Sequence, residues 1–127
     1  MSVEGLRILL VDDEQGIVDS LRILLRAEGY QVLTALGGSE AREVLSKEKL
    51  DLVVTDIRMP TVSGLEVLAR SRELDPEVPV ILMTAQASLQ SAVRAVNEGA
   101  YYYLQKPFAN DDLLAICRRA SEARELR

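Results

Sequence analysis

The sequence contains no histidine and a single cysteine, Cys117, among its 127 residues. One cysteine cannot form a disulfide within the chain, and the imidazole and thiolate ligands of a structural zinc site are missing. Cys117 falls on the same face of an expected helix as Leu113, Ile116 and Ala120, so we interpret it as a small buried hydrophobic residue. A disulfide framework and a zinc-stabilised fold are therefore excluded.

Long apolar runs and a net positive charge are also missing. The longest apolar stretches include residues 8–11 and 80–83, far short of the roughly 18 residues that a membrane-spanning helix needs. The first residues lack the apolar segment of a signal peptide. The formal net charge is −5, whereas a nucleic-acid-binding domain normally carries a basic patch. We therefore expect a cytoplasmic domain that binds neither a membrane nor nucleic acid directly.

What the sequence does contain is a regular alternation of two kinds of segment. Apolar runs predict five strands, at residues 6–11, 31–35, 50–55, 78–83 and 101–105. Apolar residues at the spacing of one helix face predict five helices, around residues 17–25, 41–45, 65–69, 89–96 and 113–120. Alternating strands and helices form a parallel sheet with helices on both faces. We therefore expect one doubly wound α/β domain of the flavodoxin-like type, with the strand order 2-1-3-4-5.

Four of the apolar runs are followed by polar residues that can bind phosphate or metal. The acidic pair Asp12 and Asp13 follows the first strand, and Asp56 follows the third. Thr84 follows the fourth strand and Lys106 the fifth. Because open α/β sheets place ligand sites outside the carboxyl ends of their strands, we expect these side chains to share one small volume.

These residue types suit phosphoryl transfer. Three crowded carboxylates repel one another unless a cation lies among them, and oxygen ligands without histidine or thiolate favour magnesium over zinc. With one Mg²⁺ and the ammonium of Lys106, the charges of the site sum to zero, which suits the binding and transfer of a phosphoryl group. An aspartate can itself be the nucleophile. Asp56 is our candidate, because the central third strand would hold it between the metal ligands and Lys106.

Taken singly, each of these residues also has an ordinary structural explanation. An acidic pair suits a solvated helix N-terminus, a lysine is usually a surface residue, and a threonine often ends a strand. Tyr103 precedes Lys106 by three residues on the same expected strand and alone would be a core or surface aromatic residue. The functional interpretation depends on the combination.

In this combination the chain resembles the receiver domain of two-component response regulators over essentially its whole length. The matching segments are residues 11–14, 56–60 with Gly64, 84–85 and 103–108. Three segments look most like CheY-like receivers of the NtrC class, whose members activate transcription with sigma-N: residues 83–85, 92–93 and 99–104. The resemblance implies a phosphorylation-dependent switch that controls an output, here transcription. It implies no enzyme activity beyond self-phosphorylation and self-dephosphorylation.

The resemblance also implies a Mg²⁺-dependent phosphoacceptor site. Asp56 would accept the phosphoryl group and contribute to metal binding. Asp13 would bind Mg²⁺ directly and Asp12 mainly through water. The backbone carbonyl of Arg58 would complete the protein ligands.

Two further pairs of residues are implied to stabilise and sense the phosphoryl group. Lys106 would pair with Asp56 and then with the phosphoryl group, and its peptide bond to Pro107 would be cis. Thr84 and Tyr103 match the switch pair of the family. After phosphorylation Thr84 would swing toward the phosphoryl oxygens and Tyr103 would turn inward. The response surface would then be the fourth helix, the fifth strand and the fifth helix.

The resemblance implies partners as well. Because the chain has no histidine, its phosphoryl donor must be a sensor histidine kinase or a small-molecule phosphodonor. We expect residues 1–127 to be the receiver domain, excised from the N-terminus of a longer regulator with an ATPase and a DNA-binding module. The last helix could continue through Ala123 and Leu126 as a linker or dimer contact, or fray in solvent. A homodimer could form through this helix or through the response surface.

Two other functional classes remain to be tested. Aspartate-nucleophile phosphatases also use acidic residues, Mg²⁺, a hydroxyl and a lysine. They share a second aspartate two residues after the nucleophile, whereas this chain has Arg58 at that position. A pseudo-receiver would be an interaction module without phosphorylation, and the intact set of site residues argues against it.

Overall fold

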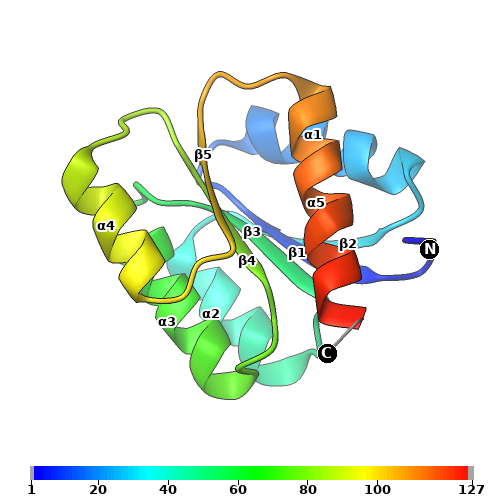
Figure 1. Cartoon of the computed structure of the whole chain (residues 1–127), viewed down its shortest axis with the longest axis horizontal. Helices are drawn as coiled ribbons and strands as arrows, with labels where there is room; N and C mark the ends of the chain where they lie inside the picture. The colour runs from blue at the N-terminus through cyan, green and yellow to red at the C-terminus, as the bar shows by residue number, and fades with distance from the viewer. Residues whose placement is uncertain (1, 126–127) are drawn as a thin grey trace.

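The computed structural model, which describes residues 2–125, contains a five-stranded parallel sheet covered by helices on both faces (Figure 1). The strands are Arg7–Val11 (β1), Gln31–Ala35 (β2), Leu52–Asp56 (β3), Val80–Thr84 (β4) and Tyr102–Gln105 (β5). The helices are Gln15–Ala27 (α1), Gly38–Lys47 (α2), Gly64–Leu74 (α3), Leu89–Asn97 (α4) and Asn110–Glu125 (α5). The strand order is β2-β1-β3-β4-β5. The flavodoxin-like α/β class and the order 2-1-3-4-5 are therefore confirmed, while Leu126 lies outside the described residues.

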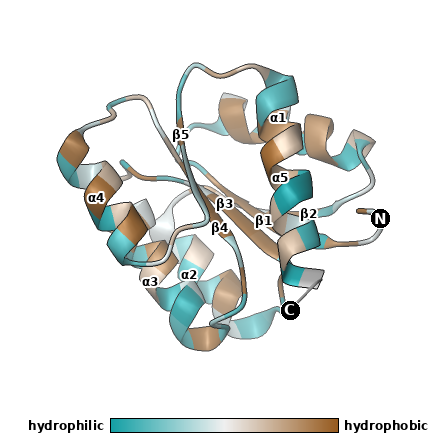
Figure 2. Ribbon diagram, viewed as in Figure 1, coloured by the Kyte–Doolittle hydropathy of each residue, from teal (hydrophilic) through white to brown (hydrophobic). Residues whose placement is uncertain are grey.

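The three central strands are buried because both of their faces are covered. All five residues of β3 and of β4 are buried. The apolar residues at the centre of the sheet are brown in Figure 2. Alternate residues of β1 enter different cores: Leu9 and Val11 pack with α2 and α3, whereas Ile8 and Leu10 pack with α1 and α5. The free thiol of Cys117 is buried in the second of these cores, as its sequence position predicts.

Helix α3 starts directly behind the end of β3. Ser63 caps this helix by accepting the backbone N–H of Glu66, whose carboxylate accepts the backbone N–H of Ser63 in return. The first helical residue is Gly64, and a Cβ atom there would overlap the carbonyl oxygen of Asp56. Only a glycine allows α3 to approach this carbonyl so closely, and the helix thereby fixes the backbone that carries Asp56.

Helix α4 buries few of its side chains against the sheet. Ala95 is its one buried residue among the nine, and Leu89, Val93 and Val96 are exposed. Ser88 caps its N-terminus by accepting the backbone N–H of Ser91 at 3.1 Å. Across residues 2–125, no helix is both long and apolar enough to span a membrane.

Candidate functional site

The carboxyl ends of β1 and β3 bring three aspartates together. Asp56 is the last residue of β3, and Asp12 and Asp13 come directly after β1. One carboxylate oxygen from each of the three lies within 4.8 Å of the others. Asp12 is completely buried and Asp56 nearly so, whereas Asp13 is exposed. This is a set of hard oxygen ligands that a small divalent cation could bind from the solvent side.

Lys106 reaches the same cluster from the end of β5. Its Nζ lies 2.8 Å from Oδ2 of Asp12 and 3.6 Å from Oδ1 of Asp56. The closer partner is Asp12, although the family resemblance points first to Asp56. The physical reason is burial, because a fully buried carboxylate requires a paired cation. The other oxygen of Asp12 accepts the backbone N–H of Glu14 at 3.0 Å.

The electrostatics of the cluster act on both partners of this pair. Burial opposes the charge of Lys106, but its hydrogen bond to Asp12 and the charge of Asp56 outweigh burial and raise the pKa of the ammonium. Burial, reinforced by the negative charge of Asp12, raises the pKa of Asp56 to about 6 against the attraction of Lys106. One ammonium therefore does not neutralise the carboxylates, and the site favours a further cation.

The peptide bond between Lys106 and Pro107 is cis. The backbone N–H of Lys106 donates to the carbonyl of Thr84 at 2.7 Å, so that the ends of β5 and β4 are joined next to the cluster. This hydrogen bond holds the backbone of Lys106 beside the end of β4. From this position the side chain of Lys106, directly after the edge strand β5, reaches Asp12, directly after β1.

Thr84 and Tyr103 lie on β4 and β5, beside the cluster. The side chain of Thr84 is buried, and its hydroxyl accepts the backbone N–H of Gln86 at 3.1 Å. Tyr103 is half-buried and packs against the core that includes Leu9. Its hydroxyl lies 2.5 Å from Oγ of Ser91 on α4. The movement of Thr84 and Tyr103 after phosphorylation stays a prediction.

A cavity of about 790 Å³ opens over the cluster. Its polar lining includes Asp13, Asp56 and Lys106, as sequence reasoning anticipated. Its apolar lining includes Ile17 and Phe108. The sequence predicted Ile17 as a packing residue of a helix and Phe108 only as part of the family motif, so neither was predicted to line the site. No sequence signal separates these two from core residues, since each shares its apolar character with the interior. The cavity can admit a donor group larger than a phosphate ion.

Arg58 also lines this cavity, two residues beyond the end of β3. Its backbone carbonyl was predicted to be a metal ligand, and this role stays a prediction, as do the individual metal-binding roles of Asp12 and Asp13. The structure brings together the side chains of Asp12, Asp13, Asp56 and Lys106. Thr84 meets this cluster only through its backbone carbonyl, which accepts from Lys106.

Residues 8–118 match the response regulator receiver domain family, and the chain belongs to that family. It is 41% identical over 113 residues to the transcriptional regulatory protein GlrR of Escherichia coli (strain K12), covering 89% of this chain and 26% of GlrR. The chain thus spans about a quarter of the length of this relative. The resemblance of this receiver to those of the NtrC class is confirmed.

Two solved structures carry the same fold. The response regulator receiver domain protein (CheY-like) from Methanospirillum hungatei JF-1 is 34% identical, with a TM-score of 0.93, 96% of this chain and 98% of that chain covered. The response regulator protein TrrA from Thermotoga maritima, solved in complex with Mg²⁺–BeF, is 36% identical with a TM-score of 0.82. The alignment with TrrA covers 91% of this chain and 98% of that chain.

Proposed function

We propose that this chain is a phosphorylation-dependent signalling switch in which Asp56 accepts a phosphoryl group. The observation that carries the proposal is the convergence of Asp12, Asp13 and Asp56 within 4.8 Å of one another, with Lys106 in contact with two of them. This arrangement supplies a nucleophile, ligands for a divalent cation and an ammonium beside them. Together with Mg²⁺ and a phosphodonor, these residues would suffice for a single stoichiometric transfer.

Asp12, Asp13 and Asp56, with the backbone carbonyl of Arg58, would hold Mg²⁺. The oxygen-only donor set and the raised pKa of Asp56 support this assignment, as does the Mg²⁺ bound to the relative TrrA. The ion supplies positive charge that offsets repulsion between the carboxylates and the incoming phosphoryl oxygens. Asp12, which is buried and paired with Lys106, would act mainly through water.

The transfer step joins an oxygen of Asp56 to phosphorus. The carboxylate attacks the phosphoryl group, a new P–O bond forms, and the bond from phosphorus to the donor breaks with its electron pair left on the donor. Since the pKa of Asp56 is about 6, most of the carboxylate is ionised at neutral pH. The donor is a sensor histidine kinase or a small phosphodonor, because the chain itself contains no histidine.

The phosphoryl group on Asp56 would be bound by Lys106 and Thr84. Phosphorylation adds about one negative charge and new acceptor oxygens. The ammonium of Lys106 and the hydroxyl of Thr84, at the ends of β5 and β4, can bind these oxygens only in the phosphorylated form. Such differential binding is what shifts a conformational equilibrium. A shift from 1:99 to 99:1 requires roughly 5.5 kcal/mol, which a few charge-assisted hydrogen bonds in a partly dry site can supply.

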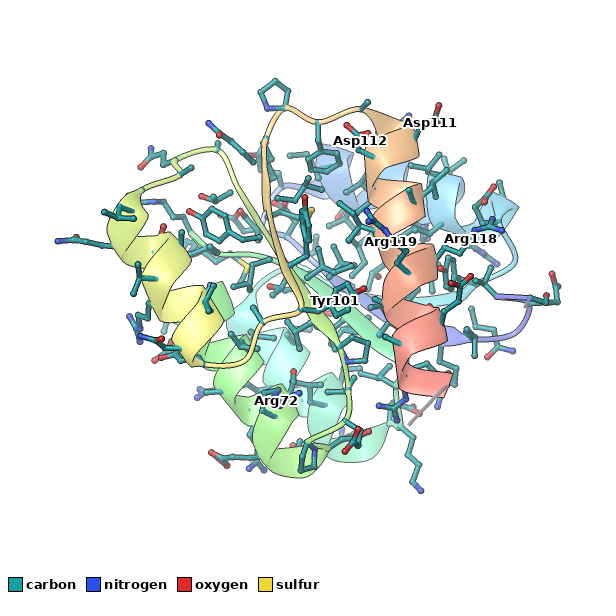
Figure 3. The ribbon with its side chains drawn as sticks, viewed as in Figure 1. Arg72, Tyr101, Asp111, Asp112, Arg118 and Arg119 are labelled. Atoms are coloured by element: carbon teal, nitrogen blue, oxygen red, sulfur yellow. The ribbon has the colours of Figure 1, made fainter. Side chains whose placement is uncertain are left out.

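The output surface would be α4, β5 and α5. This face carries the exposed apolar residues Leu89, Val93 and Tyr102. Along α5, the acidic Asp111 and Asp112 lie near the start and the basic Arg118 and Arg119 lie further on (Figure 3). An apolar centre beside a helix whose acidic and basic residues are separated along its length suits a two-fold contact with a second copy, and we assign a homodimer to this face.

In the full-length protein the switch would control transcription from the cytoplasm. The regulator GlrR is about four times longer than the aligned segment, which leaves room there for further modules. By analogy we assign to this chain the receiver domain, residues 1–127, of a longer sigma-N-dependent activator that carries an ATPase module and a DNA-binding module. Beyond its own phosphorylation and dephosphorylation we assign it no catalytic activity.

Incubation with acetyl phosphate and Mg²⁺ tests the proposal directly. Intact-protein mass spectrometry should find one phosphoryl group per chain, and none in Asp56→Asn or in the presence of a chelator. The variant Asp111→Asn, altered on the exposed start of α5, should be modified like the wild type. Multiple turnover of a small phosphoester would instead identify a phosphatase. Absence of any modification would identify a pseudo-receiver and overturn the proposal.

A further inference from the structure

The hydroxyl of Tyr103 is part of the first turn of α4. It lies 2.5 Å from Oγ of Ser91, and the backbone N–H of Ser88 donates to it at 3.4 Å. Ser88 is the N-cap of α4, and Ser91 is the third helical residue. A side chain from β5 therefore completes the polar cap of a helix whose residues it does not adjoin in sequence.

The hydroxyl groups of this cluster satisfy one another. The hydroxyls of Tyr103 and Ser91 form a hydrogen bond in which either can be the donor, and the hydroxyl of Ser91 is also placed to donate to the backbone carbonyl of Ser88 at 3.2 Å. The hydroxyl of Ser88 donates to Oγ of Ser91 at 3.0 Å and accepts the backbone N–H of Ser91. Ser91 is the residue that joins the other two hydroxyls. Removing its hydroxyl would leave Tyr103 without its short contact.

Packing does little to compensate for that loss. Ala95 is the one buried residue of α4, and elements with few buried contacts open most easily. The position of the first turn of α4 should therefore depend on its polar contacts more than on its core. The tyrosine is one of these contacts, and it stands on the strand next to Thr84, since Thr84 pairs with Gln105 in the β4–β5 register.

We propose that Ser91 is a positioning residue that ties the orientation of Tyr103 to the first turn of α4. When the ring moves, the cap of α4 loses a partner, so that a change at Tyr103 becomes a change in the exposed helix. The link between the two residues rests on the contacts alone. Its part in signalling rests on the proposed function, because it assumes that Tyr103 responds to phosphorylation of Asp56.

Fluorine NMR of the chain labelled with 3-fluorotyrosine tests the link without any phosphorylation. The four tyrosine signals are assigned with Tyr→Phe variants. Ser91→Ala should shift or broaden the Tyr103 signal alone and raise amide hydrogen exchange at the start of α4 by several-fold. Ser91→Thr, which keeps a hydroxyl, should restore both. Ser46→Ala removes a helical hydroxyl whose bond is to a carbonyl of its own helix, and it should change neither measurement.

The link is overturned if Ser91→Ala leaves the Tyr103 signal and the exchange of α4 at their wild-type values, as Ser46→Ala does. Its signalling role is tested separately with Mg²⁺ and beryllofluoride. In the wild type, the Tyr103 signal and the α4 amides should respond together, whereas in Ser91→Ala the α4 response should fall while the ligand still binds. An undiminished α4 response in Ser91→Ala would refute the signalling role. Failure of beryllofluoride to bind the wild type would instead refute the proposed function.

Discussion

At the scale of single residues, Lys106 contacts two carboxylates that differ in their exposure to the cavity. Its shorter contact is with Asp12, which is completely buried, and its longer contact is with Asp56, which faces the cavity. A phosphoryl group on Asp56 would compete with Asp12 for the same ammonium. If Asp56 is phosphorylated as proposed, Lys106 would serve the fold before phosphorylation and bind the phosphoryl group afterwards.

Replacement of Lys106 with alanine should destabilise the metal-free protein. The side chain of Lys106 is 15% exposed and that of Asp12 is fully buried, so the variant leaves a buried charge without a partner. Loss of one member of a buried pair costs about 3 kcal/mol or more. Urea unfolding in EDTA measures this, and Mg²⁺ should restore part of the loss by replacing the missing cation. Lys47→Ala, at an exposed lysine of α2, should stay within about 0.5 kcal/mol of wild type.

Replacement of Asp56 with asparagine should have the opposite effect. Because burial and the charge of Asp12 raise the pKa of Asp56 from 3.8 to about 6, the ionised form destabilises the fold by roughly 3 kcal/mol at most. In EDTA at pH 7.5, Asp56→Asn should therefore unfold at higher urea concentration than wild type.

The sign of the pH dependence follows from the raised pKa. The pKa of Asp56 is higher in the folded protein than in the unfolded chain, so protonation of this carboxyl stabilises the fold. This stabilisation is lost as pH rises through about 6. The advantage of Asp56→Asn should thus shrink as pH falls from 7.5 toward 4, and Mg²⁺ should shrink it at neutral pH. An advantage independent of both pH and Mg²⁺ would show that repulsion among the carboxylates is not its cause.

At the scale of secondary-structure elements, the start of α3 determines where Asp56 stands. A Cβ atom on Gly64 would overlap backbone atoms of Asp56 and Ile57, which cannot rotate away. Gly64→Ala should therefore push α3 from β3, lower the free energy of unfolding by 1–3 kcal/mol and weaken beryllofluoride binding. Gly16→Ala, in α1, is a matched control, since a Cβ atom there meets nothing within 4 Å. By helix propensity this control should be neutral or slightly stabilising.

Ion pairs fix the C-terminal end of α5, at the edge of the sheet opposite to the aspartate cluster. Arg124 lies 2.7 Å from Oδ2 of Asp75, after α3, and 3.8 Å from Oδ1 of Asp51, before β3. Burial opposes the charge of Asp75, but the hydrogen bonds from Arg124 and from the backbone N–H of Glu77, with the charge of Arg124, together outweigh burial and lower the pKa of this carboxyl. A lowered folded pKa gives stability that is present above the unfolded value, near 3.9, and lost as pH falls through the folded one.

Asp75→Asn should accordingly lower stability at pH 7 and lose this deficit at acid pH. The pair is partly exposed, so the effect should be modest and should weaken in high salt. Urea unfolding at pH 7 and pH 3, each with and without 1 M NaCl, measures both dependences. Glu73→Gln, which weakens an exposed pair within α3, provides the comparison. A deficit that persists unchanged at pH 3 would mean that Asp75 acts through its loop geometry rather than its charge.

At the scale of the whole molecule, the sequence was sufficient for the fold and for the edge of the sheet where the site lies. Buried central strands read as apolar runs, and their ends placed Asp12, Asp56 and Lys106 together, because a parallel sheet leaves few alternatives. The preference of Lys106 for Asp12 could not be predicted, since it depends on relative burial in three dimensions. The contact between Tyr103 and Ser91 could not be predicted either, because no periodicity links β5 to the start of α4.

The assembly of the whole molecule provides the last prediction. Val93 and Ile23 are exposed by 49% and 68% and lie on helices that pack on opposite faces of the sheet, α4 and α1. If the α4–β5–α5 face pairs with a second copy, Mg²⁺ and beryllofluoride should double the mass measured by light scattering for the wild type and for Ile23→Asp. Val93→Asp should stay monomeric while still binding beryllofluoride, because a charge would then have to be buried in the apolar centre of the contact. Equal behaviour of the two variants would place the dimer elsewhere, and a mass that never changes would leave the switch to act through other modules of the longer regulator.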